Sequence, residues 1–493
     1  MPDLELLRSV TFGSRVAEDE VDALESYFVQ TQQWARILNG EVDIVYGPKG
    51  SGKSALYSLL AKRVREFRDR GIVLIPAENP RGAAAFQDLE HDPPTSEIEF
   101  TAMWKLYFIS LLAGELSTLG IKNDAERELQ RVLEEAGLRR GTRSLGSLVH
   151  AIVSYVRSIR GVEGGVNFDS ATGAPTGVTG KITLGEPTPL QRKLGMLSVD
   201  ELIRLADEAW SKSGLTAWIL LDRLDVAFAD NSELEENALR ALFKVYLDLI
   251  VLKSVKIKIF LRSDLWKRLA RKGFREASHI TRETTITWDP PSLLNLIVRR
   301  LLTNKAVRVV YGINEENEPR SYRDQLAFFE RVFPEQIDLG ERKSSTIDWI
   351  LGRVRDGTGQ SAPREVIHLL NAARDRQCEL LERGETDSGK YLIGRAAFKQ
   401  ALAEVSLVRL EKTIYAEHPA LQGAISKLDG EKTAQSSKSL AGIWGVSEEE
   451  AGRMAADLVE VGLFEERGSK ADPEYWVPFL YRDALRMVQG SAD

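Results

Sequence analysis

The sequence has little of the chemistry that builds disulfide-linked or metal-stabilised proteins. Its 493 residues include one cysteine, Cys378, and five histidines that are scattered along the chain. A single cysteine excludes an intrachain disulfide framework and a zinc cluster built on several cysteines. The scattered histidines argue against a structural metal site. We therefore expect Cys378 to be a buried or inert thiol.

Long apolar runs and an excess of positive charge are missing as well. No stretch approaches the roughly 18 apolar residues of a membrane-spanning helix, and the N-terminus lacks the apolar core of a signal peptide. The net charge of −7 gives no global positive field for nucleic acid, so any such contact needs a local patch. With 43% hydrophobic and 28% charged residues, the composition is typical of a globular protein. We expect a cytoplasmic protein without membrane contact.

The strongest pattern is a glycine-rich stretch, Gly47-Pro-Lys-Gly-Ser-Gly-Lys-Ser54, which follows an apolar segment and precedes a helical pattern. The order strand, glycine loop, helix with the spacing GxxxxGK[ST] predicts a phosphate-binding loop. Backbone N–H groups of such a loop, and the positive end of the helix, surround phosphate. Lys53 is expected to reach the β and γ phosphates of ATP, and Ser54 to bind Mg²⁺. The predicted ATP-binding residues are Gly47, Gly50, Ser51, Gly52, Lys53, Ser54 and Ala55.

Five short apolar segments, at 42–46, 71–76, 217–221, 255–262 and 284–288, alternate with helical patterns. This alternation favours an α/β fold with a mainly parallel five-stranded sheet covered by helices. The third segment ends in Asp222, at the carboxyl end of a buried strand, where open sheets bind ligands. Asp222 is therefore expected to hold Mg²⁺. The alternative is a surface aspartate that caps the next segment.

Changes of pattern along the chain predict three domains. Residues 1–290 are expected to form the P-loop ATPase domain, which includes a lead-in helix before residue 40. A helical and glycine-rich hairpin insertion is expected within it at about 97–197. Residues 291–410 have only helical patterns and are expected to form a lid. Residues 411–493 show the order helix, helix, helix, hairpin, which is typical of a winged-helix-like domain.

Together these motifs resemble the AAA+ and STAND side of the P-loop ATPases. The resemblance is to the KAP-type NTPases and to the initiator-type ATPases of the origin-recognition class, which also end in a winged helix. The stretch from Phe12-Gly-Ser through Tyr27-Phe28 to the phosphate loop also resembles a group of bacterial P-loop ATPases. The resemblance covers roughly residues 12–410, with looser agreement in the tail. It implies an ATPase that uses ATP and Mg²⁺ and forms homo-oligomers.

The resemblance also implies candidates for the catalytic base. Many AAA+ proteins place a glutamate directly after the residue equivalent to Asp222, but this sequence has Arg223 there. The pattern Asp-Arg-Leu-Asp is closer to the KAP type and makes Asp225 a candidate. Glu78, which ends the second strand, is another candidate because some relatives hold the base at that place. A base must reach the attacking water, and the sequence does not choose between the two.

Further roles are implied for residues that sense the phosphates or reach them from a neighbour. Ser263 occupies a sensor-like position after the fourth strand, and Arg364 matches the second-sensor arginine that contacts the γ-phosphate. An ordinary surface arginine is the alternative for Arg364. Arg275 and Arg282 are candidates for an arginine finger supplied by a neighbouring subunit. The stretch 253–282 has ten basic and two acidic residues, and it could equally face DNA or solvent.

Several functions follow from these features. The favoured hypothesis is a nucleotide-driven switch or oligomeric regulator, with a protein effector as partner and phage defence as one setting. The alternatives are a DNA-associated ATPase that uses the winged helix, a nucleotide-bound scaffold that does not hydrolyse ATP and, last, a small-molecule kinase. The expected recognition helix begins with Glu448, Glu449 and Glu450, whose charge has the wrong sign for DNA phosphates. The tail could equally dock a protein.

Overall fold

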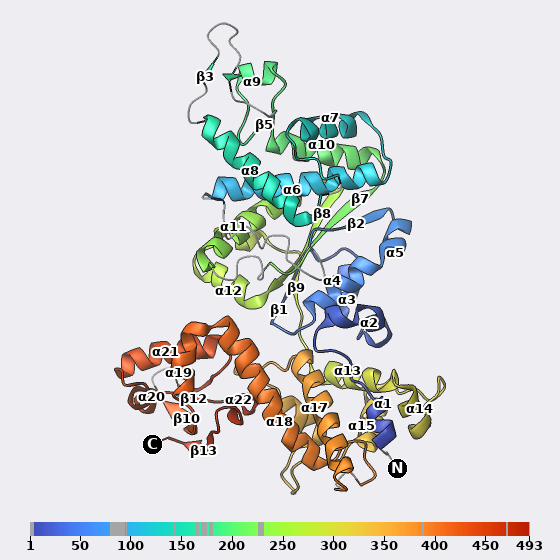
Figure 1. The fold of residues 1–493 in the computed structure, drawn as a ribbon, viewed down its shortest axis with the longest axis vertical. Helices are drawn as coiled ribbons and strands as arrows, with labels where there is room; N and C mark the ends of the chain where they lie inside the picture. The colour runs from blue at the N-terminus through green and yellow to red at the C-terminus, as the bar shows by residue number, and fades with distance from the viewer. Residues whose placement is uncertain are drawn as a thin grey trace. The chain divides into compact units, whose positions relative to one another are not determined.

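The structure is a computed structural model. It describes residues 4–492 apart from 79–93, 95, 142, 164–166, 169–174, 177–180, 225–230, 386–388, 470 and 471. The chain forms two compact units, shown in Figure 1. The sheet unit comprises Gln32–Pro48 and Gly52–Ile286, and the helical unit comprises Met1–Thr31, Lys49–Ser51 and Thr287–Asp493.

The sheet unit is built on five parallel strands, as the apolar segments predict. They are β1 (Ile44–Gly47), β2 (Ile72–Pro76), β7 (Thr216–Leu221), β8 (Val255–Arg262) and β9 (Glu283–Thr285). Their order in space is β2-β7-β8-β1-β9, and every pairing is parallel. The α/β fold class with a parallel five-stranded sheet is thereby confirmed. The strand order places β8 between the strand of the phosphate loop and the strand of Asp222.

Helices cover both faces of this sheet. The register pairs Val45 with Phe260 and Tyr46 with Leu261, and side chains of successive residues point to opposite faces. Phe260 meets Tyr57 of α4 (Lys53–Lys62) edge-on at 5.9 Å between ring centroids. Tyr46 instead stacks at 5.1 Å on Trp266 of α12 (Ser263–Arg271). The helix that follows the phosphate loop therefore lies on the face opposite α12.

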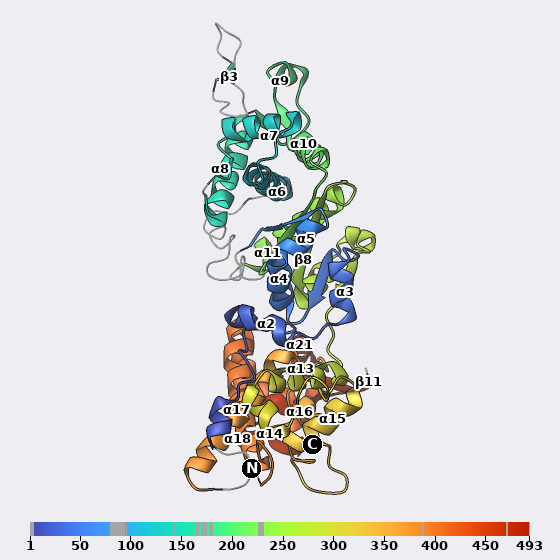
Figure 2. The same ribbon diagram turned by 90° about the vertical axis from the view of Figure 1, so that its right-hand side faces the viewer.

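The helices at the predicted insertion pack on the α12 face of the sheet, and much of its glycine-rich stretch lies outside the described residues. Its central helix, α6 (Glu97–Thr118), shares one hydrophobic core with β2, β7 and α11 (Ser232–Leu249), and Figure 2 shows its neighbours beside it. Ser198 and Glu201 form a capping box at the start of α10 (Val199–Lys212). Other elements of the sheet unit are α3 (Gln32–Leu38), α5 (Val64–Asp69), α7 (Asp124–Glu135), α8 (Leu145–Glu163), β3 (Asn167–Phe168), β4 (Pro175–Thr176), β5 (Ile182–Thr183), α9 (Pro189–Lys193), β6 (Leu197–Ser198) and α10 (Val199–Lys212).

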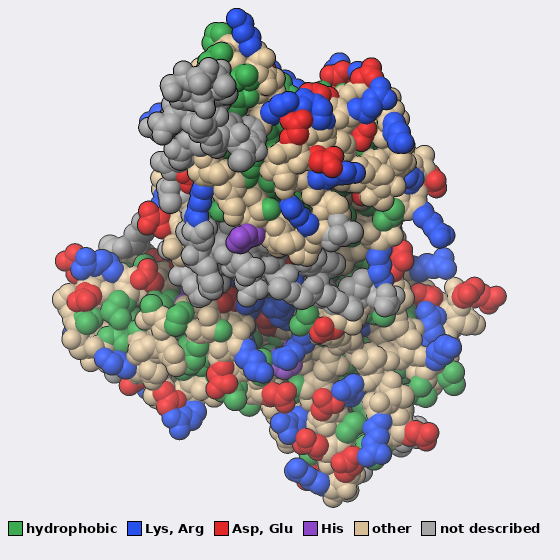
Figure 3. Space-filling view, turned by 45° about the horizontal axis from the view of Figure 1, so that its top comes forward, with side chains coloured by type: hydrophobic (Ala, Val, Ile, Leu, Met, Phe, Trp, Pro, Cys, Tyr) green, Lys and Arg blue, Asp and Glu red, His purple; other side chains and the backbone are tan. Residues whose placement is uncertain are grey.

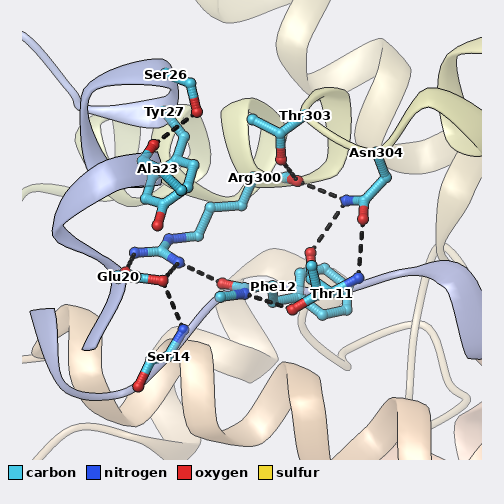
Figure 4. A pocket seen from close by; sticks show the side chains of 11 residues that line it. Thr11, Phe12, Ser14, Glu20, Ala23, Ser26, Tyr27, Arg300, Thr303 and Asn304 are labelled. Atoms are coloured by element: carbon cyan, nitrogen blue, oxygen red, sulfur yellow. Dashed lines mark hydrogen bonds and ion pairs between the residues drawn. The ribbon is translucent and has the colours of Figure 1, made fainter.

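The first thirty-one residues belong to the helical unit, which differs from the prediction that they form part of the ATPase domain. Leu7 and Phe12 are fully buried in the core of that unit. Arg300 of α13 (Pro290–Leu302) donates to Glu20 at 2.6 Å, and Asn304 accepts from the Thr11 backbone at 2.9 Å (Figure 4). Apolar burial and buried polar contacts thus fix this segment. A cavity of about 480 Å³ lies between it and α13.

The described elements of this unit before residue 410 are helices, as the helical patterns predict. The elements are α1 (Leu4–Ser9), α2 (Val21–Tyr27), α13 (Pro290–Leu302), α14 (Lys305–Tyr311), α15 (Tyr322–Val332), α16 (Thr346–Arg353), α17 (Pro363–Glu382) and α18 (Arg395–Arg409). Across the described residues, no helix has both the length and the apolar content needed to cross a membrane. Residues 287–493 group as one unit with a shared core, whereas the sequence predicts a lid and a separate C-terminal domain.

The C-terminal part has the order predicted for a winged-helix-like domain. Two helices, α20 (Ser437–Trp444) and α21 (Glu448–Glu460), precede a hairpin of β11 (Glu465–Ser469) and β12 (Asp472–Trp476). Two strands that the sequence analysis missed, β10 (Lys432–Ser436) and β13 (Val488–Ser491), complete a sheet in the order β11-β12-β10-β13. Their polar residues give no apolar alternation, so their pairing depends on tertiary context. Short helical segments, η4 (Leu410–Tyr415), α19 (Gln422–Ser426) and α22 (Phe479–Arg482), join these elements.

Candidate functional site

The glycine-rich loop that is predicted to bind phosphate runs from the end of β1 at Gly47 to the start of α4 at Lys53, so the order strand, loop, helix is as expected. Gly50 and Gly52 have φ angles of 79° and 96°, which only glycine adopts without strain. The Lys53 Nζ donates to the backbone oxygens of Gly47 and Pro48, both at 2.9 Å. The loop backbone therefore partly surrounds the Lys53 ammonium group. The first N–H groups of α4 lack intrahelical acceptors and supply donors for an anion beside it.

Two buried carboxylates lie together at the same edge of the sheet. β2 and β7 are neighbours, and the Ala77 N–H donates to the Leu220 oxygen at 2.9 Å just beyond their last paired residues. Glu78 and Asp222 follow and are 1% and 3% exposed. Burial raises the pKa of Tyr57, and the charges of Asp222 and Glu78 raise it further. Both carboxylates therefore lie near the Tyr57 hydroxyl.

The residue after Asp222 has an unusual backbone. Arg223 adopts a φ of 57°, in the left-handed region that non-glycine residues rarely enter. Such strain persists only where the surroundings enforce it, and it is found at functional sites. Asp225, the other candidate base, lies outside the described residues. Its role, like that of Glu78, stays a prediction.

The carboxyl end of β8 adds two charged residues that the sequence analysis did not single out. Arg262 is the register partner of Gly47, and its Nε and Nη2 donate to the Asp264 carboxylate at 3.1 and 2.8 Å. Burial opposes ionisation of Asp264, but the hydrogen bonds and charge of Arg262, with a contribution from Lys53, lower its pKa. An ion pair therefore lies beside the phosphate loop. The signal in the sequence is the polar triplet that ends the fourth strand, but its neighbours depend on the strand order.

Other groups at this edge fit a nucleotide and a divalent cation. The Ser263 Oγ is buried and has no hydrogen-bond partner among the described residues. An unpaired buried hydroxyl is costly, and a phosphate oxygen or a water that it holds would satisfy the hydroxyl. The Ser51 Oγ within the loop is buried and unpaired in the same way. Ser54 and Asp222 offer a hydroxyl and a carboxylate, which are oxygen donors that suit Mg²⁺.

The three candidate arginines lie in different environments. Arg364 is in the first turn of α17 in the helical unit, and its predicted contact with the γ-phosphate stays a prediction. Arg275 is exposed at the start of the short helix η3 (Arg275–His279). The Arg282 Nε donates to the Asp43 carboxylate at 2.6 Å. Asp43 precedes β1, at the edge of the sheet opposite the phosphate loop, so Arg282 is engaged within its own chain.

No known family model matches the chain, and no curated protein sequence matches it. Among solved structures, the chain is similar to the Aeropyrum pernix ORC2 protein in its ADPNP-ADP complexes. The identity is 13% and the TM-score 0.40, over 97% of this chain and 93% of that one. The ADP form of ORC2 is similar at 12% identity and a TM-score of 0.30, over 95% and 91% of the two chains. At this level of similarity, the functional inference depends on the residues of the site.

Proposed function

We propose that the protein binds ATP on its phosphate loop and hydrolyses it with Mg²⁺. The observation that carries the proposal is the carboxyl edge of the parallel sheet, where the loop, Asp222 and Glu78 follow the ends of β1, β7 and β2. A lysine for the phosphates, an oxygen ligand for the metal and a buried carboxylate as base are the groups that transfer of a phosphoryl group to water requires.

The residues of the loop and of β7 bind and orient the triphosphate. Lys53 releases its hydrogen bonds to the Gly47 and Pro48 oxygens and donates to the β and γ phosphates. Ser54 and Asp222 would hold Mg²⁺, which neutralises charge on the transferred phosphoryl group when it is bound. Arg262 is a further cation at this edge. Its carboxylate partner Asp264 fixes the direction of its guanidinium.

Glu78 is the base that we favour. It accepts a proton from the water that attacks the γ-phosphate, and ADP and inorganic phosphate leave. Its position one strand from Asp222, and its 1% exposure, support this role. Asp225 is the alternative base, and the turnover of Glu78→Gln and Asp225→Asn distinguishes between the two.

We further propose that nucleotide exchange drives a switch, with phage defence as one setting. In many such switches, the presence of the γ-phosphate orders a segment at the phosphate site or closes a second domain over it, and hydrolysis reverses the change. The exposed Arg275 favours a homo-oligomer in which this arginine reaches a neighbour's nucleotide. A protein effector is the partner that such a switch would control.

A DNA-associated ATPase is the second candidate, and the order of elements at the C-terminus supports it. Charge argues against it. The first turn of α21 holds Glu448, Glu449 and Glu450, and acidic and basic side chains are interspersed over the face drawn in Figure 3. The Arg467 guanidinium lies over the Trp476 ring, 4.0 Å from its centroid, so the ring covers one face of this cation. DNA binding would therefore need a patch smaller than the usual basic footprint.

The test is phosphate release from ATP by the purified protein, with and without DNA, together with its size in solution. We expect turnover that requires Mg²⁺ and is lost in Lys53→Ala. Glu78→Gln should lower turnover to a small residual rate, whereas Asp225→Asn should retain parental turnover. The opposite result assigns the base to Asp225. Nucleotide binding without turnover would identify a scaffold, and turnover that requires DNA would favour the second candidate.

A further inference from the structure

Two buried tyrosines hold the backbone at the end of β2. The Tyr107 hydroxyl donates to the Ala77 oxygen at 2.6 Å, and the Tyr57 hydroxyl donates to the Glu78 oxygen at 2.7 Å. Both rings are buried, with 0% and 1% exposure. Two consecutive carbonyl groups are therefore fixed immediately before and at the favoured base.

The tyrosines approach this point from opposite faces of the sheet. Tyr57 belongs to α4, on the face of Phe260. Tyr107 belongs to α6 and lies in the hydrophobic core with Val73 and Ile75 on the other face. A carbonyl pair held from both sides cannot rotate without breaking one of the two bonds. Such restraint on both sides is what a carboxylate needs if it is to keep one direction.

Tyr57 also connects the phosphate loop with Glu78. It follows Lys53 by four residues in α4, so the two side chains lie on the same side of the helix. The Tyr57 hydroxyl therefore joins the start of α4 to the Glu78 carbonyl through one hydrogen bond. Tyr107 in the same way joins α6, the central helix of the insertion, to the Ala77 carbonyl.

We propose that Tyr57 and Tyr107 are positioning residues for Glu78 and orient its carboxylate toward the attacking water. This inference rests on the proposed function, because it assigns the base to Glu78. It also gives the insertion a part in the reaction, since α6 supplies one of the two hydroxyls. Neither tyrosine needs to touch ATP. Their removal should therefore affect the rate of the chemical step rather than nucleotide affinity.

The experiment replaces each hydroxyl with hydrogen in the full chain. Tyr57→Phe and Tyr107→Phe are each expected to lower kcat for ATP by about 10- to 100-fold, the cost of a base displaced by roughly 1 Å. KM and the affinity for a non-hydrolysable ATP analogue should stay within about threefold of the parent, as expected when only the transition state is affected. Tyr246→Phe is the matched control. It removes a buried hydroxyl that donates to Asp43 at 3.3 Å, at the other edge of the same sheet, and it should keep parental kcat.

Combination with Glu78→Gln separates positioning from general destabilisation. If the tyrosines act only through Glu78, adding Tyr57→Phe to Glu78→Gln should not lower the residual rate further. Thermal unfolding of each variant checks that it is folded, and Tyr57→Phe alone carries the test if Tyr107→Phe unfolds. Parental kcat in a folded tyrosine variant, an equal loss of analogue affinity, or a further loss in the Glu78→Gln background would overturn the inference. A parent protein that binds ATP without hydrolysing it would overturn the proposed ATPase activity, and this inference with it.

Discussion

The Arg282 Nε donates to the Asp43 Oδ2 at 2.6 Å, and the same carboxylate accepts from the Lys258 Nζ through Oδ1 at 2.7 Å. Asp43 and Lys258 are each 2% exposed, and burial lowers the pKa of Lys258. Lys258 of β8 and Arg282, which directly precedes β9, thus share the buried carboxylate of Asp43 before β1. This arrangement ties three adjacent segments of the sheet together.

Asp43→Asn should destabilise the protein strongly because it leaves Lys258 buried without its anion. We expect a loss of about 3–5 kcal/mol in the free energy of unfolding, measured by urea denaturation. Lys258→Met should cost less, since Asp43 keeps Arg282 and the Tyr246 hydroxyl as partners. Equal losses in the two variants would show that the carboxylate is not the centre of this network.

Lys53→Ala should abolish nucleotide binding without unfolding the chain. The ammonium is the loop's own cation for the β and γ phosphates, and the loop oxygens that it now binds can accept water instead. Titration with a fluorescent ATP analogue and a thermal melt give the two readouts. Lys49→Ala changes a lysine at a variable position of the same signature and is the matched control. Parental affinity in folded Lys53→Ala would refute the phosphate-site assignment.

Asp222→Asn should retain most nucleotide affinity and lose Mg²⁺-dependent turnover. The substitution keeps the shape of the side chain and removes the charge that a divalent cation requires. Phosphate release over a range of Mg²⁺ concentrations is the measurement. If turnover keeps its parental Mg²⁺ dependence, the metal ligand is elsewhere.

Most of the sheet could be predicted because its strands are short apolar segments that end in polar residues. The pattern around Val255–Arg262 is an example, and the loop from Gly47 to Ser54 carries its chemistry in its spacing. Neighbour relations could not be predicted in this way. Arg262 is a candidate because the register pairs it with Gly47, and Tyr107 is a candidate because α6 contacts the end of β2; neither contact follows from the sequence pattern.

The N-terminal segment shows a second limit. Its apolar residues predict burial, but they do not specify the partner surface. Glu20 pairs with Arg300, about 280 residues later in the chain, and a side chain at Gly13 would require the Arg300 and Glu20 side chains to shift. Long-range polar contacts of this kind leave no periodic signal, so domain boundaries are predicted less well than strands.

His368 should make stability depend on pH. Burial, with the charges of Arg15 and Lys412, lowers its pKa from 6.5 to about 4. Between these values the unfolded chain binds more protons, so stability falls as the pH falls from 6.5 toward 4, by up to about 3 kcal/mol. His368→Gln should flatten this part of the curve in urea denaturation. An unchanged slope would mean that His368 takes up its proton in the folded state.

Arg275 is the remaining candidate for an arginine finger, because Arg282 is held by Asp43 in its own chain. If Arg275 acts across an interface, Arg275→Ala should bind ATP normally and hydrolyse it about 10³-fold more slowly or worse. A finger stabilises charge that develops in the transition state, so the loss appears in turnover before affinity. Lys253→Ala, in the same basic stretch, is the matched control and should keep parental turnover.

Mixing two inactive variants tests whether the active site is shared between subunits. In a mixed oligomer of Arg275→Ala and Lys53→Ala, some interfaces combine the intact phosphate loop of the first variant with the intact arginine of the second. Phosphate release should therefore return to a fraction of the parental rate, and that fraction should depend on the mixing ratio. A protein that hydrolyses ATP within one chain offers no such rescue. Absence of rescue in a demonstrated mixed oligomer would mean that the cation at the γ-phosphate comes from the same chain. Arg262 would then be the candidate, because it is the register partner of Gly47 at the start of the phosphate loop.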